Sequence, residues 1–353
     1  MSMEDIELYP LLFEPNLREV IWGGARLKAW KGLPADNRLI GESWEVSDLD
    51  ERPSIVSNGP YGGMKIHDVI NLAGARLLGR SVVEKYGLEL PLLVKFIDAD
   101  KDLSIQVHPN DEMAQRCHGK KGKTEMWYII DATPGASLYA GFKERITPYE
   151  YASRVRDGSI CDVLARHDVK PGDVFYIPAG RVHAICGGIL LVEVQQSSDV
   201  TYRIFDYNRR DTNGNLRELH TDLAAQAIDY EVQDDYRTNY IDESERAIPV
   251  IRSPHFNIRV MDIANPFHRN MVKYDSFVIS VCLRGSCSIV VRGRQDVAPV
   301  VLTEGHSCLI PAEIADYDIV PIDGYVKIME TFIDNKDQSL AGRLNRFFHI
   351  SRK

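Results

Sequence analysis

KPGDVFYIPAGRVHAI, residues 170–185, is the stretch on which the fold prediction rests. It places Gly172 before a short apolar run, VFYI, and Pro178, Gly180 and His183 after it. Runs of β-branched and aromatic residues bounded by glycine and proline are typical of strands. The stretch therefore predicts a short strand between two tight turns, with His183 just past the second turn. A single histidine in such a place is more often structural than a metal ligand.

Two upstream stretches add further candidate ligands. Gln106 and His108 lie in LSIQVHPND, and Glu125 lies in GKTEMWYII. Successive side chains of a strand point to opposite faces, so residues two apart share a face. We therefore expect Ser104, Gln106 and His108 on one face of their strand, and Lys123 with Glu125 on one face of the next.

Brought together inside a β-barrel, these residues would form a metal site of mixed nitrogen and oxygen ligands. The predicted ligands are Gln106, His108, Glu125 and His183. Three or four protein ligands, with a position left for water or substrate, are typical of a catalytic site. Zinc accepts this ligand set, and so do manganese, cobalt and iron(II).

Length and charge limit the kinds of protein this chain can be. At 353 residues it is long enough for two domains, and 44% hydrophobic with 26% charged residues is the composition of a globular protein. A net charge of −9 gives no reason to expect nucleic acid as a partner. An acidic amino end and the absence of a long apolar run predict a cytoplasmic protein that does not enter a membrane.

The pattern of elements predicts two β domains. We expect a metal-binding domain over residues 1–240 and a second domain over 248–353, separated by an acidic stretch. Apolar residues at helical spacing predict helical insertions in the first domain at about 64–87, 147–169 and 217–230.

The second domain repeats part of the motif found at residues 170–185. TEGHSCLIPAEIADYDI has the same glycine-to-proline spacing, at Gly305 and Pro311, but carries Asp316 where the first copy has His183. We therefore expect a second β-barrel of the same type that has lost the metal and has a structural or oligomerising role.

The glycine, proline and histidine spacing resembles the second motif of the cupin superfamily. More narrowly, LSIQVHPND, GKTEMWYI, IPAGRVHAI and EVQQSSDVTYR resemble the type I mannose-6-phosphate isomerases in their short bacterial form. The four motifs occur in the family's order over roughly residues 40–210. The resemblance implies a mainly β fold of two cupin-type jelly-roll barrels with helical insertions. It also implies one zinc ion per chain, held by Gln106, His108, Glu125 and His183. Many cupins, oxygenases among them, carry histidine at the Gln106 position, so the resemblance favours zinc over iron.

Such an enzyme interconverts mannose 6-phosphate and fructose 6-phosphate, a reaction of carbohydrate metabolism. The reaction moves a proton between C1 and C2 through an enediol. It needs a Lewis acid at the sugar oxygens, a base that reaches a carbon-bound proton, and cations or hydroxyl groups for the phosphate.

The resemblance also suggests which residues carry this chemistry. Lys123, Glu193 and Arg203 match active-site positions of the family. We expect either Lys123 or Glu193 to transfer the proton, and Arg203 to bind substrate or to stabilise charge. Lys95 lies in an otherwise apolar strand and needs an anion, because burying an unpaired ammonium group is costly. Ser104, Lys95 and Arg203 are the predicted phosphate-binding residues.

Two other classes of function fit the same motifs. One is a different metal-dependent cupin, either a phosphosugar isomerase of another specificity or an iron oxygenase. The other is a sugar-binding bicupin without turnover. The sequence is compatible with a monomer and with a homodimer.

Overall fold

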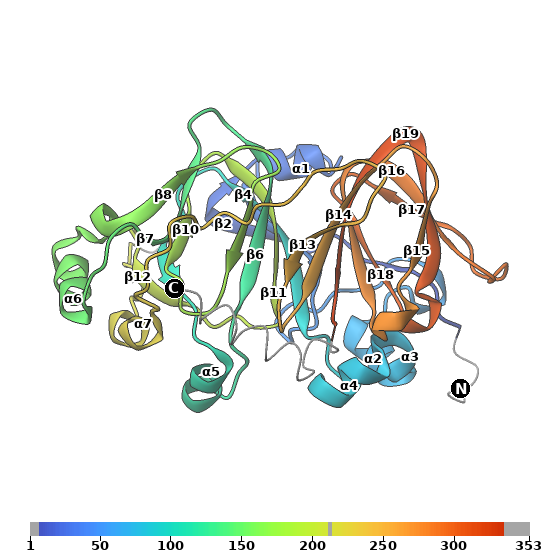
Figure 1. The fold of residues 1–353 in the computed structure, drawn as a ribbon, viewed down its shortest axis with the longest axis horizontal. Coiled ribbons are helices and arrows are strands. Elements are labelled where there is room, and N and C mark those ends of the chain that lie inside the picture. The colour runs from blue at the N-terminus through green and yellow to red at the C-terminus, as the bar shows by residue number, and fades with distance from the viewer. Residues whose placement is uncertain (1–6, 211–213, 335–353) are drawn as a thin grey trace, which may run out of the picture. The chain divides into compact units, whose positions relative to one another are not determined.

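The structure is a computed structural model that describes residues 7–210 and 214–334. The chain is mainly β, as the sequence predicts (Figure 1). Within the described residues, no helix is both long enough and apolar enough to cross a bilayer.

The described chain forms two compact units, and it enters each of them more than once. The central unit comprises Pro15–Leu49 and Leu92–Asn239, and the terminal unit comprises the residues up to Glu14, Asp50–Pro91 and the residues from Tyr240 onward. The chain passes from the central to the terminal unit between Asn239 and Tyr240, which is where the sequence placed a domain boundary. The predicted 1–240 domain is nevertheless divided, because residues 7–14 and the first helical insertion belong to the terminal unit. Residues 335–353 of the predicted second domain lie outside the described part.

Backbone contacts explain why these early segments belong to the terminal unit. β1 (Leu11–Leu12) pairs with β18 (Ser307–Ile310). A side chain at Gly79 would lie 2.0 Å from the carbonyl oxygen of Asp275, so only glycine allows this close approach. The Asp275 carboxylate accepts a hydrogen bond of 3.1 Å from the backbone N–H of Ser81. The β1–β18 pairing joins segments that are 298 residues apart (Leu11 to Leu309), and the Ser81–Asp275 hydrogen bond joins residues that are 194 apart, which local patterns do not predict.

Two antiparallel sheets build the central unit. The first has the order β2-β3-β4-β11-β6-β9. Its middle strands, β4 (Leu92–Ala99) and β11 (Ile189–Gln196), are buried at every position, so both of their faces are covered. The other strands are β2 (Leu17–Gly24), β3 (Ile40–Val46), β6 (Glu125–Ala132) and β9 (Val174–Ile177).

The second sheet of the central unit has the order β12-β5-β10-β7-β8. Its strands are β5 (Ile105–Val107), β7 (Ser137–Phe142), β8 (Leu164–Asp168), β10 (His183–Ile185) and β12 (Tyr202–Phe205). The predicted strand VFYI is β9 of the first sheet, and β10 of the second sheet begins at His183. The turn at Pro178 and Gly180 therefore carries the chain from one sheet to the other.

Helices of the central unit agree only in part with the predicted insertions. They are α1 (Arg26–Trp30), α5 (Asp111–His118), α6 (Pro148–Asp157), η3 (Ile160–Val163) and α7 (Thr221–Ala227). α6 begins with Thr147 and Glu150 in a reciprocal capping box. The prediction of helix over 147–169 is wrong from Leu164 onward, where β8 pairs with β7, and before that the helix is interrupted between α6 and η3. The third insertion is shorter than the predicted 217–230.

The terminal unit is built around two long strands, β16 (Val278–Val291) and β19 (Asp316–Phe332). They lie in a sheet of order β1-β18-β16-β19-β14-β13, with β15 paired to β19 and β17 to β16. The remaining strands are β13 (Ile248–Arg252), β14 (Asn257–Ile263), β15 (Phe267–Asn270) and β17 (Val300–Thr303), and the short helices are η2 (Gly59–Tyr61), η4 (Val272–Tyr274) and η5 (Ala312–Ile314).

The predicted insertion at 64–87 forms three helices rather than one. They are α2 (Ile66–Ala73), α3 (Ala75–Leu78) and α4 (Arg80–Tyr86). Gly74 and Gly79, both with positive φ, separate them. Figure 1 shows the three helices gathered at one end of the strands of the terminal unit.

The internal repeat is visible in local structure. Gly172 and Gly305 both have positive φ, and each precedes a four-residue strand that is followed by proline. The copies differ after the proline, where the second forms η5 and then reaches Asp316 at the start of β19. Asp316 is partly exposed and contacts His268 at 2.6 Å.

Candidate active site

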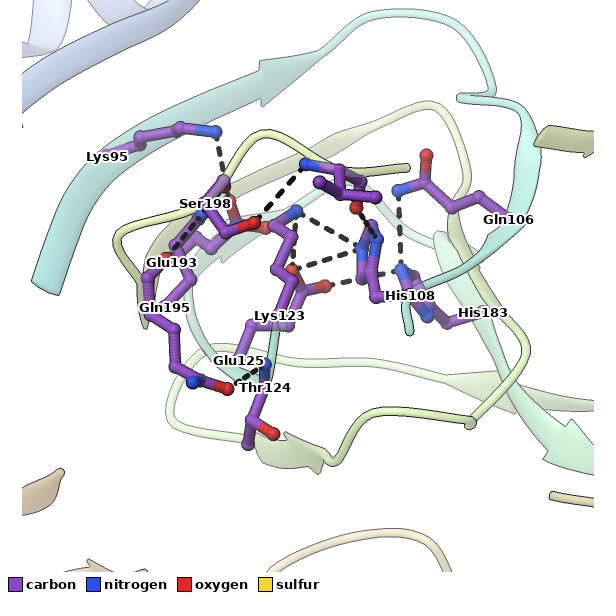
Figure 2. A network of polar contacts seen from close by, with 12 residues as sticks. Lys95, Gln106, His108, Lys123, Thr124, Glu125, His183, Glu193, Gln195 and Ser198 are labelled. Atoms are coloured by element: carbon purple, nitrogen blue, oxygen red, sulfur yellow. Dashed lines mark hydrogen bonds and ion pairs between the residues drawn. The ribbon is translucent and has the colours of Figure 1, made fainter. Parts of the chain in front are cut away.

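Three of the four predicted metal ligands lie together in the central unit (Figure 2). Nε2 of His108 is 3.4 Å from Oε2 of Glu125, and Nε2 of His183 is 3.3 Å from Oε1 of the same carboxylate. These ligand atoms all lie within 4.8 Å of one another. The three side chains are buried. They come from three separate segments: Glu125 begins β6, His183 begins β10, and His108 directly follows β5.

Gln106 reaches the same cluster, but with its amide nitrogen. This nitrogen lies 3.3 Å from Nε2 of His183, and the two residues are directly opposite each other in β5 and β10. A metal ion needs the amide oxygen at that place. Turning the terminal amide group by about 180° exchanges its two ends, which are nearly identical in shape.

Backbone carbonyl groups fix the orientation of both imidazole rings. Nδ1 of His108 lies 3.0 Å from the carbonyl oxygen of Val200, and Nδ1 of His183 lies 2.8 Å from that of Arg181. Each Nδ1–H can donate to its carbonyl, which leaves the lone pair of Nε2 facing Glu125. Burial lowers the pKa of His183, and burial with the Lys123 charge lowers the pKa of His108 to about 3. Both rings are therefore neutral at pH 7, the form that binds metals.

The Glu125 carboxylate shows that these residues fit a cation. Burial alone would raise its pKa, but the charge of Lys123, joined at low pH by the charges of the protonated histidines, outweighs burial and holds the pKa well below its ordinary value. Both oxygens are buried, and neither accepts a hydrogen bond from any described residue. Its one close charge is Nζ of Lys123, at 2.7 Å from Oε2 and 3.1 Å from Nε2 of His108. A buried charge with so few partners is costly, and a bound cation would complete its coordination.

The register of the sheets aligns the other predicted residues in two cross-strand rows. In the five-stranded sheet, Arg203 is opposite Gln106, which is opposite His183. In the six-stranded sheet, Trp44, Lys95, Glu193 and Trp127 are opposite one another in that order. We call the second set the Lys95–Glu193 row.

Within this row, Lys95 forms an ion pair with Glu193, which is the anion that a lysine in an apolar strand needs. Its Nζ is 3.4 Å from Oε1 of Glu193 and 4.8 Å from the centre of the Trp44 ring. Nε1–H of Trp127 donates to Oε2 of Glu193 at 2.9 Å. Burial, followed by the Glu125 charge, raises the pKa of Glu193 above its ordinary value despite these donors.

Lys123 stays protonated. Burial lowers its pKa, but the Glu125 and Glu193 carboxylates outweigh burial, so the pKa lies above its ordinary value. Ser104 is buried directly before β5, and no polar contact among the described residues connects it to the cluster. The structure thus brings Lys123 to the ligands, and the role of Ser104 stays a prediction.

Arg203 lies in a group of arginines that the sequence analysis missed. Its Nη1 donates to the carbonyl oxygen of Glu218 at 2.8 Å, while its buried Nε has no partner among the described residues. Arg209 and Arg217 both form ion pairs with Asp206. Burial lowers the pKa of Arg203, and the charge of Arg217 lowers it further. The three arginines face two carboxylates, Asp206 and the exposed Glu218, so one positive charge is left over. The sequence YNRR, residues 207–210, follows Arg203 closely and could have indicated a group of arginines here.

The sequence analysis also missed the turn at residues 196–200, whose hydrogen bonds hold backbone groups next to His108 and Lys123. Nε2 of Gln195 donates to the carbonyl oxygens of Gln196 and Ser198 at 2.9 and 2.6 Å (Figure 2). Oγ of Ser198 donates to the carbonyl oxygen of Lys121 at 2.7 Å. The turn thereby holds both Val200, which orients His108, and the segment that carries the Lys123 side chain.

Known proteins share this arrangement of sequence and fold. The family model "Phosphomannose isomerase type I, catalytic domain" matches residues 11–129. The chain is 34% identical to the probable mannose-6-phosphate isomerase GmuF of Bacillus subtilis over 88% of this chain and 96% of that protein. It is 42% identical to mannose-6-phosphate isomerase ManA of the same organism over 62% of this chain and 68% of that one.

A solved structure gives the same result for the fold. The mannose 6-phosphate isomerase from Bacillus subtilis superimposes with a TM-score of 0.81 at 31% identity, covering 92% of this chain and 99% of that one. Its match extends over both units, so the likeness is not confined to the motifs around the candidate ligands. The chain belongs to the type I mannose-6-phosphate isomerase (phosphomannose isomerase) family.

Proposed function

We propose that this protein is a zinc-dependent isomerase that interconverts mannose 6-phosphate and fructose 6-phosphate. The observation that supports it most is the ionised, buried Glu125 carboxylate between the Nε2 atoms of two neutral histidines. The relatives GmuF and ManA, which are named mannose-6-phosphate isomerases, support the choice of substrate.

His108, Glu125 and His183 would hold the metal, with Gln106 as a fourth ligand through its amide oxygen. A divalent metal at such a site supplies Lewis acidity to the substrate's carbonyl and hydroxyl oxygens. Zinc rests on the nitrogen and oxygen ligand set together with the family resemblance, because the ligand types alone also suit manganese, cobalt and iron(II).

We infer that Glu193, rather than Lys123, transfers the proton. Its pKa is raised, which brings a carboxylate nearer to the range of an effective base at neutral pH. The Lys123 ammonium group has its pKa raised as well and holds its proton, so it does not serve as the base. Lys123 instead places a positive charge beside the reacting oxygens.

The proposed proton transfer is balanced within the site. The Glu193 carboxylate takes the C2 proton of the open-chain aldose, which leaves an enediolate. The same carboxyl group returns that proton to C1, and the proton of the C2 hydroxyl ends on the C1 oxygen. The product is the ketose, and Glu193 regains its starting form.

Arg203 and its neighbours are our candidates for the phosphate end of the substrate. The unpartnered Nε of Arg203 and the excess charge of the arginine group suit a dianion, which arginine binds with a planar fork of donors. Lys95 was predicted for this role as well, but its ion pair with Glu193 suggests that it acts on that carboxylate instead.

The test is turnover of mannose 6-phosphate that carries deuterium at C2. Proton transfer at C2 predicts slower conversion than with the ordinary substrate and appearance of fructose 6-phosphate. Activity that requires iron(II) and oxygen would replace this proposal with an oxygenase. Phosphosugar binding without product would replace it with a binding protein. The cytoplasmic location and the monomer or homodimer state stay predictions.

A further inference from the structure

Trp127 connects the candidate proton-transfer group to a candidate metal ligand. It lies in β6, two residues after Glu125, and its side chain is fully buried. Its indole N–H donates to Oε2 of Glu193 at 2.9 Å. Its ring meets the His183 ring edge to face, with centroids 5.3 Å apart and planes at 75°. One rigid side chain therefore contacts both groups.

The sheet register determines this placement. Trp127 is directly opposite Glu193 in the β6–β11 pair, and Lys95 is opposite Glu193 on the other side, in the β11–β4 pair. Each oxygen of the carboxylate therefore faces one donor, Oε2 facing Trp127 and Oε1 facing Lys95. Neighbouring strands thus hold the carboxylate from both sides.

The two donors differ in stiffness. Nζ of Lys95 ends a flexible chain and lies 3.4 Å from its oxygen, whereas the Trp127 donor is part of a ring enclosed by the core. A buried indole N–H without an acceptor is costly, so the Trp127 ring favours the one Glu193 orientation that accepts its hydrogen bond. The orientation of the carboxylate depends mainly on Trp127.

We propose that Trp127 is a positioning residue, which aims the Glu193 carboxylate at the reacting carbons through the indole N–H. This inference rests on the proposed function and deepens it. The hydrogen bond acts on the proton transfer, while the ring edge packs against His183. A change that removes only the N–H should therefore affect the orientation of Glu193 and leave the packing against His183 intact.

The test replaces Trp127 by β-(3-benzothienyl)alanine, which keeps the shape of the ring and exchanges the N–H for sulfur. We expect kcat to fall roughly ten- to one-hundredfold, the usual worth of one hydrogen bond to a charged group. The KM and the metal content should stay near those of the unmodified protein. The simpler variant Trp127→Phe should show the same fall in kcat. Trp30→Phe, which alters a tryptophan packed on Phe96, is the matched control and should keep full activity.

The decisive comparison repeats the replacement in a Glu193→Gln background. Positioning through Glu193 predicts no further loss of kcat there, because the group that Trp127 aims is already disabled. An equal loss in both backgrounds, an unchanged kcat, or a loss that follows loss of metal would each overturn the inference. An unmodified protein that fails to isomerise mannose 6-phosphate with a full complement of metal would instead contradict the proposed function itself.

Discussion

The rings of Trp127 and His183 meet edge to face across the two sheets of the central unit, with centroids 5.3 Å apart. Trp127 belongs to the Lys95–Glu193 row of the six-stranded sheet, and His183 belongs to the row of Arg203 and Gln106 in the five-stranded sheet. The ring contact therefore joins the row of the candidate base to the row that holds two candidate metal ligands, Gln106 and His183. Metal binding and proton transfer can be tested separately because different residues carry them.

Removing a ligand should remove the metal. For His183→Ala we expect bound metal to fall far below one equivalent and isomerase activity to fall with it, since the remaining ligands leave an incomplete site. Elemental analysis of the purified variant measures this. His306→Ala, in the terminal unit, is the control and should keep its metal. A His183→Ala protein with a full equivalent of metal would contradict the assigned ligand set.

Lys123→Met should destabilise the metal-free protein more than the metal-loaded one. Without a metal, the Lys123 ammonium is the closest positive charge to the buried Glu125 carboxylate, at 2.7 Å. Breaking a buried pair by removing one partner costs about 3–5 kcal/mol. Urea unfolding with and without a chelator measures the difference. An equal loss in both conditions would mean that Glu125 does not depend on Lys123 for its charge balance.

Lys95→Met should shift the acid side of the pH–rate profile to higher pH. Burial and the Glu125 charge already raise the pKa of Glu193, and Lys95 opposes that rise. Without Lys95 the pKa rises further, so a higher pH is needed to form the carboxylate that acts as base. Metal content should not change. A profile that moves to lower pH, or loss of metal, would show that Lys95 acts in another way.

The terminal unit contains its own buried ion pair, whose loss should affect stability but not catalysis. Arg269 and Glu330 are both buried, with Nε of Arg269 3.1 Å from each carboxylate oxygen, and the Tyr317 hydroxyl donates to Glu330 at 2.6 Å. Arg269→Met leaves the carboxylate unpaired and should cost about 3–5 kcal/mol in the free energy of unfolding. The kcat per folded molecule should stay unchanged.

An exposed pair in the same unit gives the matched control. Arg292 and Asp318 are 3.3 Å apart and lie near the surface. Arg292→Met should therefore change the free energy of unfolding by less than about 1 kcal/mol. Equal effects of the Arg269 and Arg292 variants would contradict the assignment of Arg269 and Glu330 as a buried, stabilising pair.

Much of the candidate site could be predicted because its residues lie in short strands or directly beside them. Strand alternation grouped His108 with Gln106, and motif spacing placed His183 at the end of a turn. The need of Lys95 for an anion was also foreseeable from its apolar strand. Its partner was not, because Glu193 lies opposite Lys95 only through the register of β4 and β11.

The remaining differences come from contacts distant in sequence. The helical insertion expected over 147–169 ends early because the chain from Leu164 onward pairs with β7, and propensity does not reveal that partner. The first insertion joins the terminal unit through the close approach of Gly79 to Asp275. α5 was overlooked although its signals were local, with Asn110 as N-cap and Gly119 ending the helix in the left-handed conformation.

The central claim is that the buried ligands bind zinc and that this zinc supports isomerisation. The most direct measurement is elemental analysis of the purified protein combined with a coupled assay for fructose 6-phosphate, before chelation, after chelation and after zinc is restored. We predict about one zinc per chain, loss of activity on chelation, and recovery on adding zinc. A protein that carries its full zinc and still forms no fructose 6-phosphate, or one that stays fully active without metal, would contradict the account.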